Sequence, residues 1–331
     1  MNLPYHAHIE PTTYCNIKCE NCINDTVQVE RRGHLSINTL KDILKMMPFI
    51  RDISLLGLGE PLMNPEILDM LGLIKSKGIA CRIATNGMLL DKIDIMKLLN
   101  SIDQCIISFD AATKEKFEEI KKGSDFDRIV KNIKDIVEIM DKNKIPAEIS
   151  LHTVITKNNL GEVSDIPEMA AKLMVDKVRF VMAVQYTQGA SLPVRDRTQT
   201  GGKWNNPLNP PLLRGTKGVV IPDPKILIHY AEIERELMKT LNDRCKRYNL
   251  GFSFTTSEKK FHTCWWPNGG IYVTYDGFIT PCCLRMDPLI YNFGNIFRNS
   301  VNEIFSGEKY QGFREGFREG RVPDICSTCP S

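Results

Sequence analysis

The chain has 331 residues, of which 42% are hydrophobic and 25% charged, a composition typical of a globular protein. Its 43 basic and 40 acidic residues leave a formal charge of only +3, which gives no support to a nucleic-acid partner. Its apolar runs fall short of the ~20 residues that a membrane-spanning helix needs, and residues 1–6 do not resemble a secretory signal. We therefore expect a cytoplasmic protein with no membrane partner.

Strand-like and helix-like segments alternate from residue 6 to about residue 185. Such alternation predicts parallel βαβ units with right-handed crossovers. The six strands are fewer than a complete β/α barrel contains, so we expect an open, partial (β/α)6 barrel. Ser36 and Asp125 are suited to begin helices, and Gly78 is suited to end one. In chain order the segments are a strand at 8–11, a helix at 36–47, a strand at 53–58, a helix at 65–77, a strand at 79–85, a helix at 91–100, a strand at 104–109, a helix at 126–142, a strand at 147–155, a helix at 159–174 and a strand at 177–184.

The rest of the sequence divides into a linking part and a small C-terminal unit. Residues 187–224 are rich in Pro, Gly, Arg and Asn without a clear period, which predicts a long loop or lid, and residues 226–248 have helical spacing. The pair Asp276-Gly277 between two β-rich runs predicts a hairpin. The lysine pair Lys121-Lys122 lies beside acidic residues and predicts a solvated helix face. We expect three parts: a partial barrel over 1–186, a loop with a linking helix over 187–261, and a small α+β domain over 262–331.

Eleven cysteines are many for a cytoplasmic chain, and in a reducing compartment they indicate metal or redox chemistry rather than disulfides. Three of them, Cys81, Cys105 and Cys245, are scattered, and we expect them to pack as small apolar side chains. The other eight form two groups. The first group is Cys15, Cys19 and Cys22, and the second is Cys264, Cys282, Cys283, Cys326 and Cys329.

The first group has the spacing C-x3-C-x2-C and follows the first strand. A loop there lies at the mouth of the sheet, where α/β proteins place their chemistry. Three thiolates on a four-iron cluster leave one iron without a protein ligand, so that iron can bind a substrate or cofactor. A zinc site would need a fourth ligand, for which His34 and Asp25 are the nearby candidates. We favour the cluster.

This motif resembles the signature of the radical S-adenosylmethionine (SAM) superfamily. The resemblance implies a [4Fe–4S] cluster whose open iron binds the amino and carboxylate groups of SAM. One electron then cleaves SAM, and the resulting 5′-deoxyadenosyl radical abstracts a hydrogen atom from the substrate. Asn21 departs from the family, which usually has an aromatic or bulky apolar residue before the third cysteine.

Further positions resemble the family at the ends of successive strands. Gly57-Leu58-Gly59-Glu60-Pro61 is similar to the family's GGE motif, whose backbone receives the SAM amino group, with Leu58 in place of one glycine. For each single residue, turn or capping chemistry is an alternative. The SAM-binding residues that the resemblance implies are Gly57, Gly59, Glu60, Pro61, Asn86, Ser108 and Asp110.

The second group can close a site of four thiolates. Successive side chains on a strand point to opposite faces, so Cys282 and Cys283 do not easily share one metal. We assign Cys264, Cys282, Cys326 and Cys329 as ligands and leave Cys283 aside. Spacing alone fits both a structural zinc and an iron–sulfur cluster.

Residues around these cysteines resemble the auxiliary-cluster module called SPASM or twitch. The resemblance implies one auxiliary [4Fe–4S] cluster, because five cysteines fit the shorter form. The implied fold class is α/β, a partial (β/α)6 barrel followed by a small α+β auxiliary iron–sulfur domain. The segments that carry the resemblance are Cys264-Trp265-Trp266-Pro267, Tyr275-Asp276-Gly277, Pro281-Cys282-Cys283, Gly294-Asn295-Ile296, Val301-Asn302-Glu303-Ile304-Phe305 and Cys326-x2-Cys329.

The implied function is oxidation of a small polar metabolite by a radical SAM enzyme, with the auxiliary cluster accepting an electron. An electron donor such as flavodoxin or ferredoxin would reduce the SAM-binding cluster. The first alternative is an enzyme that modifies a peptide or protein. An alternative of another class is a non-catalytic iron–sulfur electron carrier. The catalytic acid or base stays unassigned, since His152 on the fifth strand is as well explained by core packing.

Overall fold

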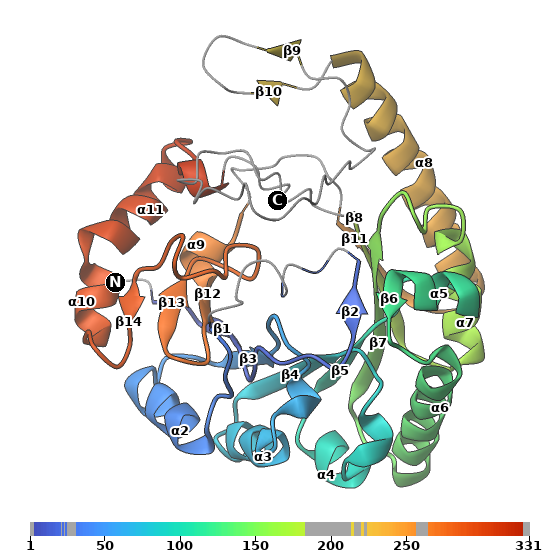
Figure 1. The fold of residues 1–331 in the computed structure, drawn as a ribbon, viewed down its shortest axis with the longest axis horizontal. Helices are drawn as coiled ribbons and strands as arrows, with labels where there is room; N and C mark the ends of the chain where they lie inside the picture. Colours follow the sequence, from blue (N-terminus) through green and yellow to red (C-terminus); the bar gives the residue numbers. More distant parts are fainter. Residues whose placement is uncertain are drawn as a thin grey trace, which may run out of the picture.

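A computed structural model provides the structure of the protein, and it describes residues 3–20, 22, 24, 31–182, 213–214, 220–221, 224–255 and 264–326. A curved sheet forms the centre, and helices cover its outer face (Figure 1). The six strands expected from the sequence are all present and run parallel to their neighbours. They are β1 (His6–Ile9), β3 (Asp52–Leu55), β4 (Ala80–Thr85), β5 (Gln104–Ser108), β7 (Glu148–Ile155) and β8 (Lys177–Met182).

Strands from the C-terminal part of the chain extend this sheet at both ends. In the described residues its order is β11-β8-β7-β5-β4-β3-β1-β12-β13-β14. The strand β11 pairs parallel with β8, and β12 pairs parallel with β1. The hairpin expected at Asp276-Gly277 joins β12 to β13, and Gly277 adopts a φ of 87° at its turn. These strands are β11 (Gly251–Thr255), β12 (Gly270–Val273), β13 (Phe278–Thr280) and β14 (Gly294–Asn295).

The helices begin and end largely as their capping residues predict. Ser36 accepts a hydrogen bond from the backbone N–H of Thr39, and Asp125 accepts one from Arg128. Gly78 follows its helix with a φ of 67°. The helices are α2 (Ile37–Met46), α3 (Ile67–Ser76), α4 (Ile95–Asn100), α5 (Lys114–Ile120), α6 (Phe126–Asn143), α7 (Ile166–Lys172) and α8 (Pro224–Arg247) on the barrel, and α9 (Trp266–Gly269), α10 (Val301–Ser306) and α11 (Glu308–Arg318) in the C-terminal part.

Helix α5 and strand β11 were absent from the sequence-based prediction. Helix α5 lies between β5 and α6, and it contributes Phe117 and Ile120 to the core. Strand β11 follows α8 directly, and its alternating Phe252 and Phe254 are the sequence signal that marks it. A predicted helix at 159–174 is shorter than expected, because Val163–Asp165 forms a 3-10 turn before α7 begins.

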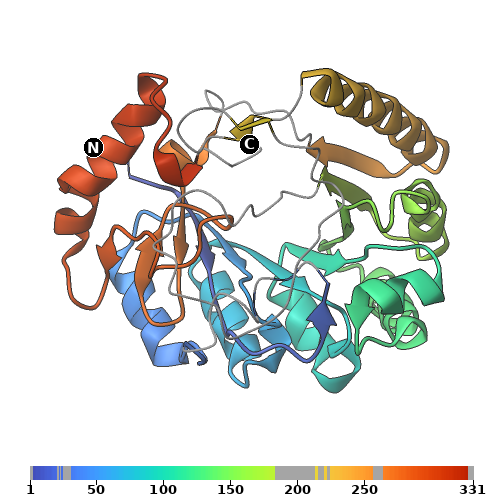
Figure 2. The ribbon, with the colours of Figure 1, turned by 45° about the horizontal axis from the view of Figure 1, so that its top comes forward.

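Alternation along the strands separates an apolar outer face from a polar concave face. Ala7 and Ile9 of β1 are fully buried beneath the helices, whereas His6 and His8 point the other way. Cys81 and Cys105 are 0% exposed on the outer face, as predicted, and burial raises the pKa of each thiol to about 12. The alternation therefore places the polar side chains on the concave face of the sheet. Figure 2 shows the sheet curving around this face, with the helices on the other side.

An aromatic cluster of Phe109, Phe117 and Phe126 joins the end of β5 to α5 and α6. The ring centroids are 5.1 to 5.8 Å apart, and Phe109 and Phe117 are 0% exposed. Phe109 lies between Ser108 and Asp110, so this cluster fixes the position of both residues. Among the described residues, no helix is both long and apolar enough to cross a lipid bilayer.

Replacing Phe109 with alanine is expected to lower the free energy of unfolding by about 3–5 kcal/mol, because the cavity left in this cluster cannot close. The control is Phe297→Ala, since the Phe297 side chain is 44% exposed and its loss should change stability little. Urea unfolding of the two variants measures both effects. Equal losses of stability would contradict the proposed importance of the cluster.

Candidate functional site

The loop that carries Cys15, Cys19 and Cys22 follows β1 at the mouth of the barrel. Its short strand β2 (Lys18–Cys19) pairs antiparallel with β6 (Lys121–Lys122), which follows α5. The backbone N–H of Cys22 donates to the carbonyl oxygen of Cys19 over 3.1 Å. This pairing anchors the cysteine loop to the far side of the barrel mouth.

The three thiols of this loop lie close enough to influence one another. Burial raises the pKa of Cys15 and raises that of Cys19 to about 11, and negative charge on the neighbouring thiols raises both further. Thiolates in this position therefore need a positively charged partner, which the iron of a cluster provides. Among the described residues, no three His, Cys, Asp or Glu side chains converge tightly enough to hold a single metal ion. A cluster takes each thiolate on a different iron, so it needs three neighbouring thiols and no such convergence.

Lys121 is buried beside Cys19, whereas the sequence predicted a solvated position for it. Its side chain is 4% exposed, and its Nζ lies 2.7 Å from Oδ2 of Asp110. The nearby ammonium group lowers the pKa of the Cys19 thiol against the effect of burial. Oδ1 of Asp110 accepts a hydrogen bond from the backbone N–H of Val154, so both carboxylate oxygens of Asp110 are engaged within the protein.

The segment at residues 57–61 packs directly on the backbone of the cysteine loop. The N–H groups of Gly59 and Glu60 donate to the carbonyl oxygens of Thr12 and Tyr14 over 3.2 and 2.8 Å. A side chain at Gly59 would place its Cβ 2.5 and 2.4 Å from these same two oxygens. Gly59 is therefore required for the cysteine loop to lie against this turn. The N–H groups of Gly59 and Glu60 are used in these contacts, and the carbonyl oxygen of Leu58 accepts a hydrogen bond from Nδ2 of Asn24 over 3.0 Å.

The Glu60 carboxylate holds the ends of two strands together. It is 2% exposed and accepts hydrogen bonds from Thr85 Oγ1 at 2.6 Å and from the backbone N–H of Asn86 at 2.7 Å. Asn86 in turn donates from Nδ2 to Oδ1 of Asn16 in the cysteine loop. Glu60 and Asn86 thus position the loop through hydrogen bonds within the protein.

Two other predicted SAM-binding residues, Pro61 and Ser108, lie in different settings. Pro61 starts a 3-10 turn at Pro61–Met63 and is buried. Ser108 ends β5 half-buried, and its hydroxyl makes no hydrogen bond to any residue that the structure describes. Ser108 is therefore the predicted side chain that stays available to a ligand.

Glu10, which the sequence analysis did not single out, joins the cysteine loop to the C-terminal hairpin. It directly follows β1 and is 0% exposed. Its carboxylate accepts hydrogen bonds from the Tyr272 hydroxyl at 3.0 Å and from the backbone N–H groups of Tyr275 at 3.3 Å and Leu58 at 3.5 Å. Burial raises the pKa of Glu10 from 4.5 to about 7, and these hydrogen bonds oppose the shift. An acidic residue within the apolar end of a strand was the available sequence signal.

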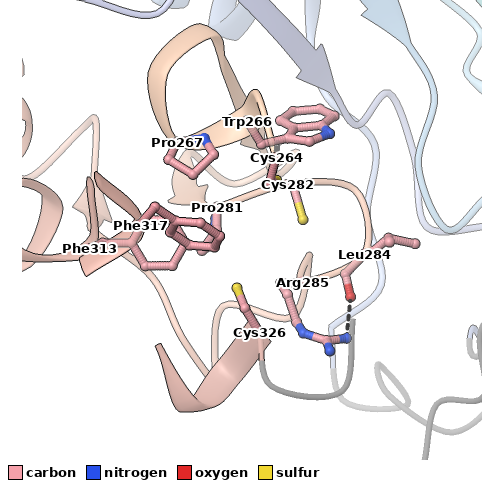
Figure 3. Close-up of a pocket in the computed structure, with 10 residues that line it drawn as sticks. All are labelled: Cys264, Trp266, Pro267, Pro281, Cys282, Leu284, Arg285, Phe313, Phe317 and Cys326. Carbon is pink, nitrogen blue, oxygen red and sulfur yellow. Dashed lines mark hydrogen bonds between the residues drawn. The ribbon is translucent and has the colours of Figure 1, made fainter. Parts of the chain in front are cut away.

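The C-terminal cysteines meet at one pocket (Figure 3). Cys264, Cys282 and Cys326 line it, and the thiols of Cys282 and Cys326 point toward the space between them. Cys283 is half-buried and does not line this pocket. Cys329, the fourth predicted ligand, lies outside the described residues. The remaining lining residues are mainly apolar: Trp266, Pro267, Pro281, Leu284, Arg285, Phe313 and Phe317.

Replacing Gly59 with alanine is expected to lower the iron bound per chain after anaerobic reconstitution, because the new methyl group collides with the backbone of the cysteine loop. Gly161→Ala is the matched control, since no atom lies within 4 Å of its Cβ position. Iron analysis of both variants decides the outcome. Equal iron contents would show that the close packing at Gly59 does not support the metal site.

Replacing Glu10 with glutamine is expected to make stability less sensitive to rising pH. The folded-state pKa is raised from 4.5 to about 7, so the stabilising contribution of protonated Glu10 is complete below pH 4.5 and is lost as the pH rises through 7. Between pH 4.5 and 7 the free energy of unfolding of the variant should therefore rise by about 3 kcal/mol relative to that of the wild type. Urea unfolding of both proteins at a series of pH values measures the difference, and parallel stability curves would contradict it.

Comparison with known proteins gives matches over both parts of the chain. The family model for the radical SAM superfamily matches residues 9–170, and the model for SPASM, an iron–sulfur cluster-binding domain, matches residues 264–330. A tungsten-containing aldehyde ferredoxin oxidoreductase cofactor-modifying protein from Pyrococcus furiosus is 23% identical over 98% of this chain and 86% of its own length. An AdoMet-dependent heme synthase from Nitratidesulfovibrio vulgaris is 20% identical over 97% of this chain and 83% of its own length.

Two solved structures share the fold. Streptococcus suis SuiB bound to S-adenosylmethionine has a TM-score of 0.67 and 17% identity, over 95% of this chain and 68% of SuiB. The anSMEcpe structure with bound AdoMet and a peptide has a TM-score of 0.64 and 19% identity, over 99% of this chain and 86% of that protein.

Proposed function

Because this chain belongs to the radical SAM superfamily and contains a SPASM iron–sulfur domain, we propose that it is an enzyme that oxidises a small polar metabolite. Proteins of this superfamily bind SAM and a [4Fe–4S] cluster, and SPASM domains bind auxiliary clusters. When bound, the first cluster would supply the electron that splits SAM into methionine and a 5′-deoxyadenosyl radical, and the auxiliary cluster would accept the electron that the substrate radical loses together with a proton.

The observation that carries this proposal is the direct connection between the two cysteine groups. Strand β1 leads into the loop of Cys15, and its neighbour β12 leads from the Cys264 segment into the hairpin before Cys282. Their register pairs Ile9 with Val273 at the C-terminal ends of both strands. A site fully ligated by Cys264, Cys282, Cys326 and Cys329 has no open iron, so electron transfer is the chemistry that it supports.

The protein's own residues orient the reactants at the barrel mouth. Cys15, Cys19 and Cys22 would hold the SAM-binding cluster. The buried ammonium of Lys121, paired with Asp110, provides a positive charge beside Cys19, and the carbonyl oxygens of Gly57 and Gly59 can accept hydrogen bonds from an ammonium group. The Ser108 hydroxyl is available to a polar group of SAM or of the substrate.

A peptide or protein substrate is the alternative, and two of the solved relatives contain bound peptides. Those likenesses concern the fold, so the substrate class is decided by experiment. We also propose a cytoplasmic location, since cysteines grouped for metal chemistry suit a reducing compartment. We propose reduction by a flavodoxin or ferredoxin, since the exposed Cys22 thiol places the first cluster near the protein surface. Because the superfamily consists of enzymes, the role of a non-catalytic electron carrier is set aside.

The variant Cys15→Ala is expected to abolish formation of 5′-deoxyadenosine from SAM under reducing conditions, because the first cluster loses a ligand. The variant Cys282→Ala should still cleave SAM but lose oxidation of the substrate to background, because the electron acceptor is lost. Anaerobic assays that quantify 5′-deoxyadenosine and product in parallel separate these two effects.

Cys283→Ala is the matched control for Cys282, since it removes the adjacent thiol outside the pocket and should leave both activities close to those of the wild type. A wild-type product at the same oxidation level as the substrate would refute the proposed oxidation. A wild-type protein that forms no 5′-deoxyadenosine would refute the whole mechanism.

A further inference from the structure

The concave face of the sheet carries a positive charge at β8 that no described residue neutralises. Arg179 is exposed and forms no ion pair with any residue that the structure describes. Its neighbours in register are His152 on β7 and Ser253 on β11. The residues flanking it in sequence, Val178 and Phe180, are 0% exposed in the core beneath the helices. Arg179 therefore points to the concave side, into the barrel.

His152 on β7 faces the same region, and His8 on β1 packs its ring against Trp266. Burial lowers the pKa of His152 to about 3 and that of His8 well below its ordinary value, and the charge of Arg179 lowers both further. In the register of β7 and β8, Arg179 lies directly beside His152. Both imidazoles are neutral at pH 7 and can each donate one hydrogen bond. Nδ1 of His8 is inaccessible to solvent and has no hydrogen-bond partner among the described residues.

The acidic groups on this face are already engaged by other partners. Asp52 forms an ion pair with Arg82, and Glu148 accepts a hydrogen bond from Gln104. Lys177, two residues before Arg179, adds a second cationic side chain to the same face of β8. The concave face near β7 and β8 therefore carries two cationic side chains, Lys177 and Arg179, and one carboxylate, Glu148, whose partner Gln104 is neutral.

We propose that Arg179, with His152 and Ser253 beside it, binds an oxyanion group of the substrate, either a carboxylate or a phosphate. The planar guanidinium can donate two parallel hydrogen bonds to such a group, and the imidazole and hydroxyl can donate one each. The anion would hold one end of the substrate within the barrel while the rest extends toward the cysteine loop. This inference rests on the proposed function for its use of the barrel as the substrate site.

Isothermal titration of the anaerobically reconstituted protein with inorganic phosphate and, separately, with succinate tests the site. The wild type should bind at least one of these anions, and the tighter one identifies the substrate's charged group. Arg179→Gln should weaken that binding at least about ten-fold, because it removes the charged donor of two parallel hydrogen bonds to the anion. Arg179→Lys keeps the charge but loses the planar guanidinium group, so its affinity for the anion should lie between those of the wild type and Arg179→Gln.

Arg298→Gln is the matched control, since it removes an exposed arginine from the C-terminal part, away from β8, and should leave the affinity unchanged. Ser253→Ala gives a second variant with a small structural change, for which we expect weaker binding. Failure of the wild type to bind either anion, or equal affinity of wild type and Arg179→Gln, would overturn the assignment. The titration uses neither SAM nor reductant, so its result is independent of the test for SAM cleavage.

Discussion

The pairing of β1 on both of its edges is the constraint on which the rest of the structure depends. One edge forms hydrogen bonds with β3 of the barrel and the other with β12 of the C-terminal part. The polypeptide leaves β1 at Glu10, whose buried carboxylate then receives hydrogen bonds from both sides, from Leu58 and from Tyr272. The cysteine loop starts directly after this point. The position of the loop is therefore determined by two sheet pairings and one buried carboxylate. A shift of the β12–β13 hairpin would move Glu10 and with it the cysteine loop.

Several of the predicted SAM-binding residues also hold the cysteine loop in place. Glu60, Asn86 and Asp110 all have their polar atoms engaged by other parts of the protein. Burial makes these hydrogen bonds costly to leave unmade, which keeps the loop in one arrangement. The groups that stay available lie elsewhere: the Ser108 hydroxyl at the end of β5, and Arg179 with His152 on the concave face. The hydrogen-bonded residues thus hold the cysteine loop in place, and the unengaged side chains are the ones that can bind a small molecule.

The sequence-based prediction was correct for elements with a strong local pattern, and it was wrong or silent where burial by distant residues sets the environment of a side chain. The six barrel strands, the caps at Ser36 and Asp125, and the hairpin at Asp276-Gly277 all follow from local patterns, and the structure contains them. Lys121 was predicted to be solvated because its neighbours in sequence are charged, yet pairing of β6 with β2 buries it beside Cys19. Glu10 was not singled out, because its hydrogen-bond partner Tyr272 is distant in sequence.

The sequence by itself determined the chemistry available to this protein: two groups of cysteines at metal-binding spacings, a glycine-rich turn after the second barrel strand, and the alternation that builds a parallel sheet. Spacing and periodicity depend only on neighbours along the chain, so they can be read without the fold. Only the tertiary structure decided which groups share a site. It brought Cys264, Cys282 and Cys326 to one pocket, placed β12 against β1, and left Arg179 without an acidic partner among the described residues. These outcomes depend on contacts between residues far apart in sequence, whose burial and charge exist only once the sheet has formed.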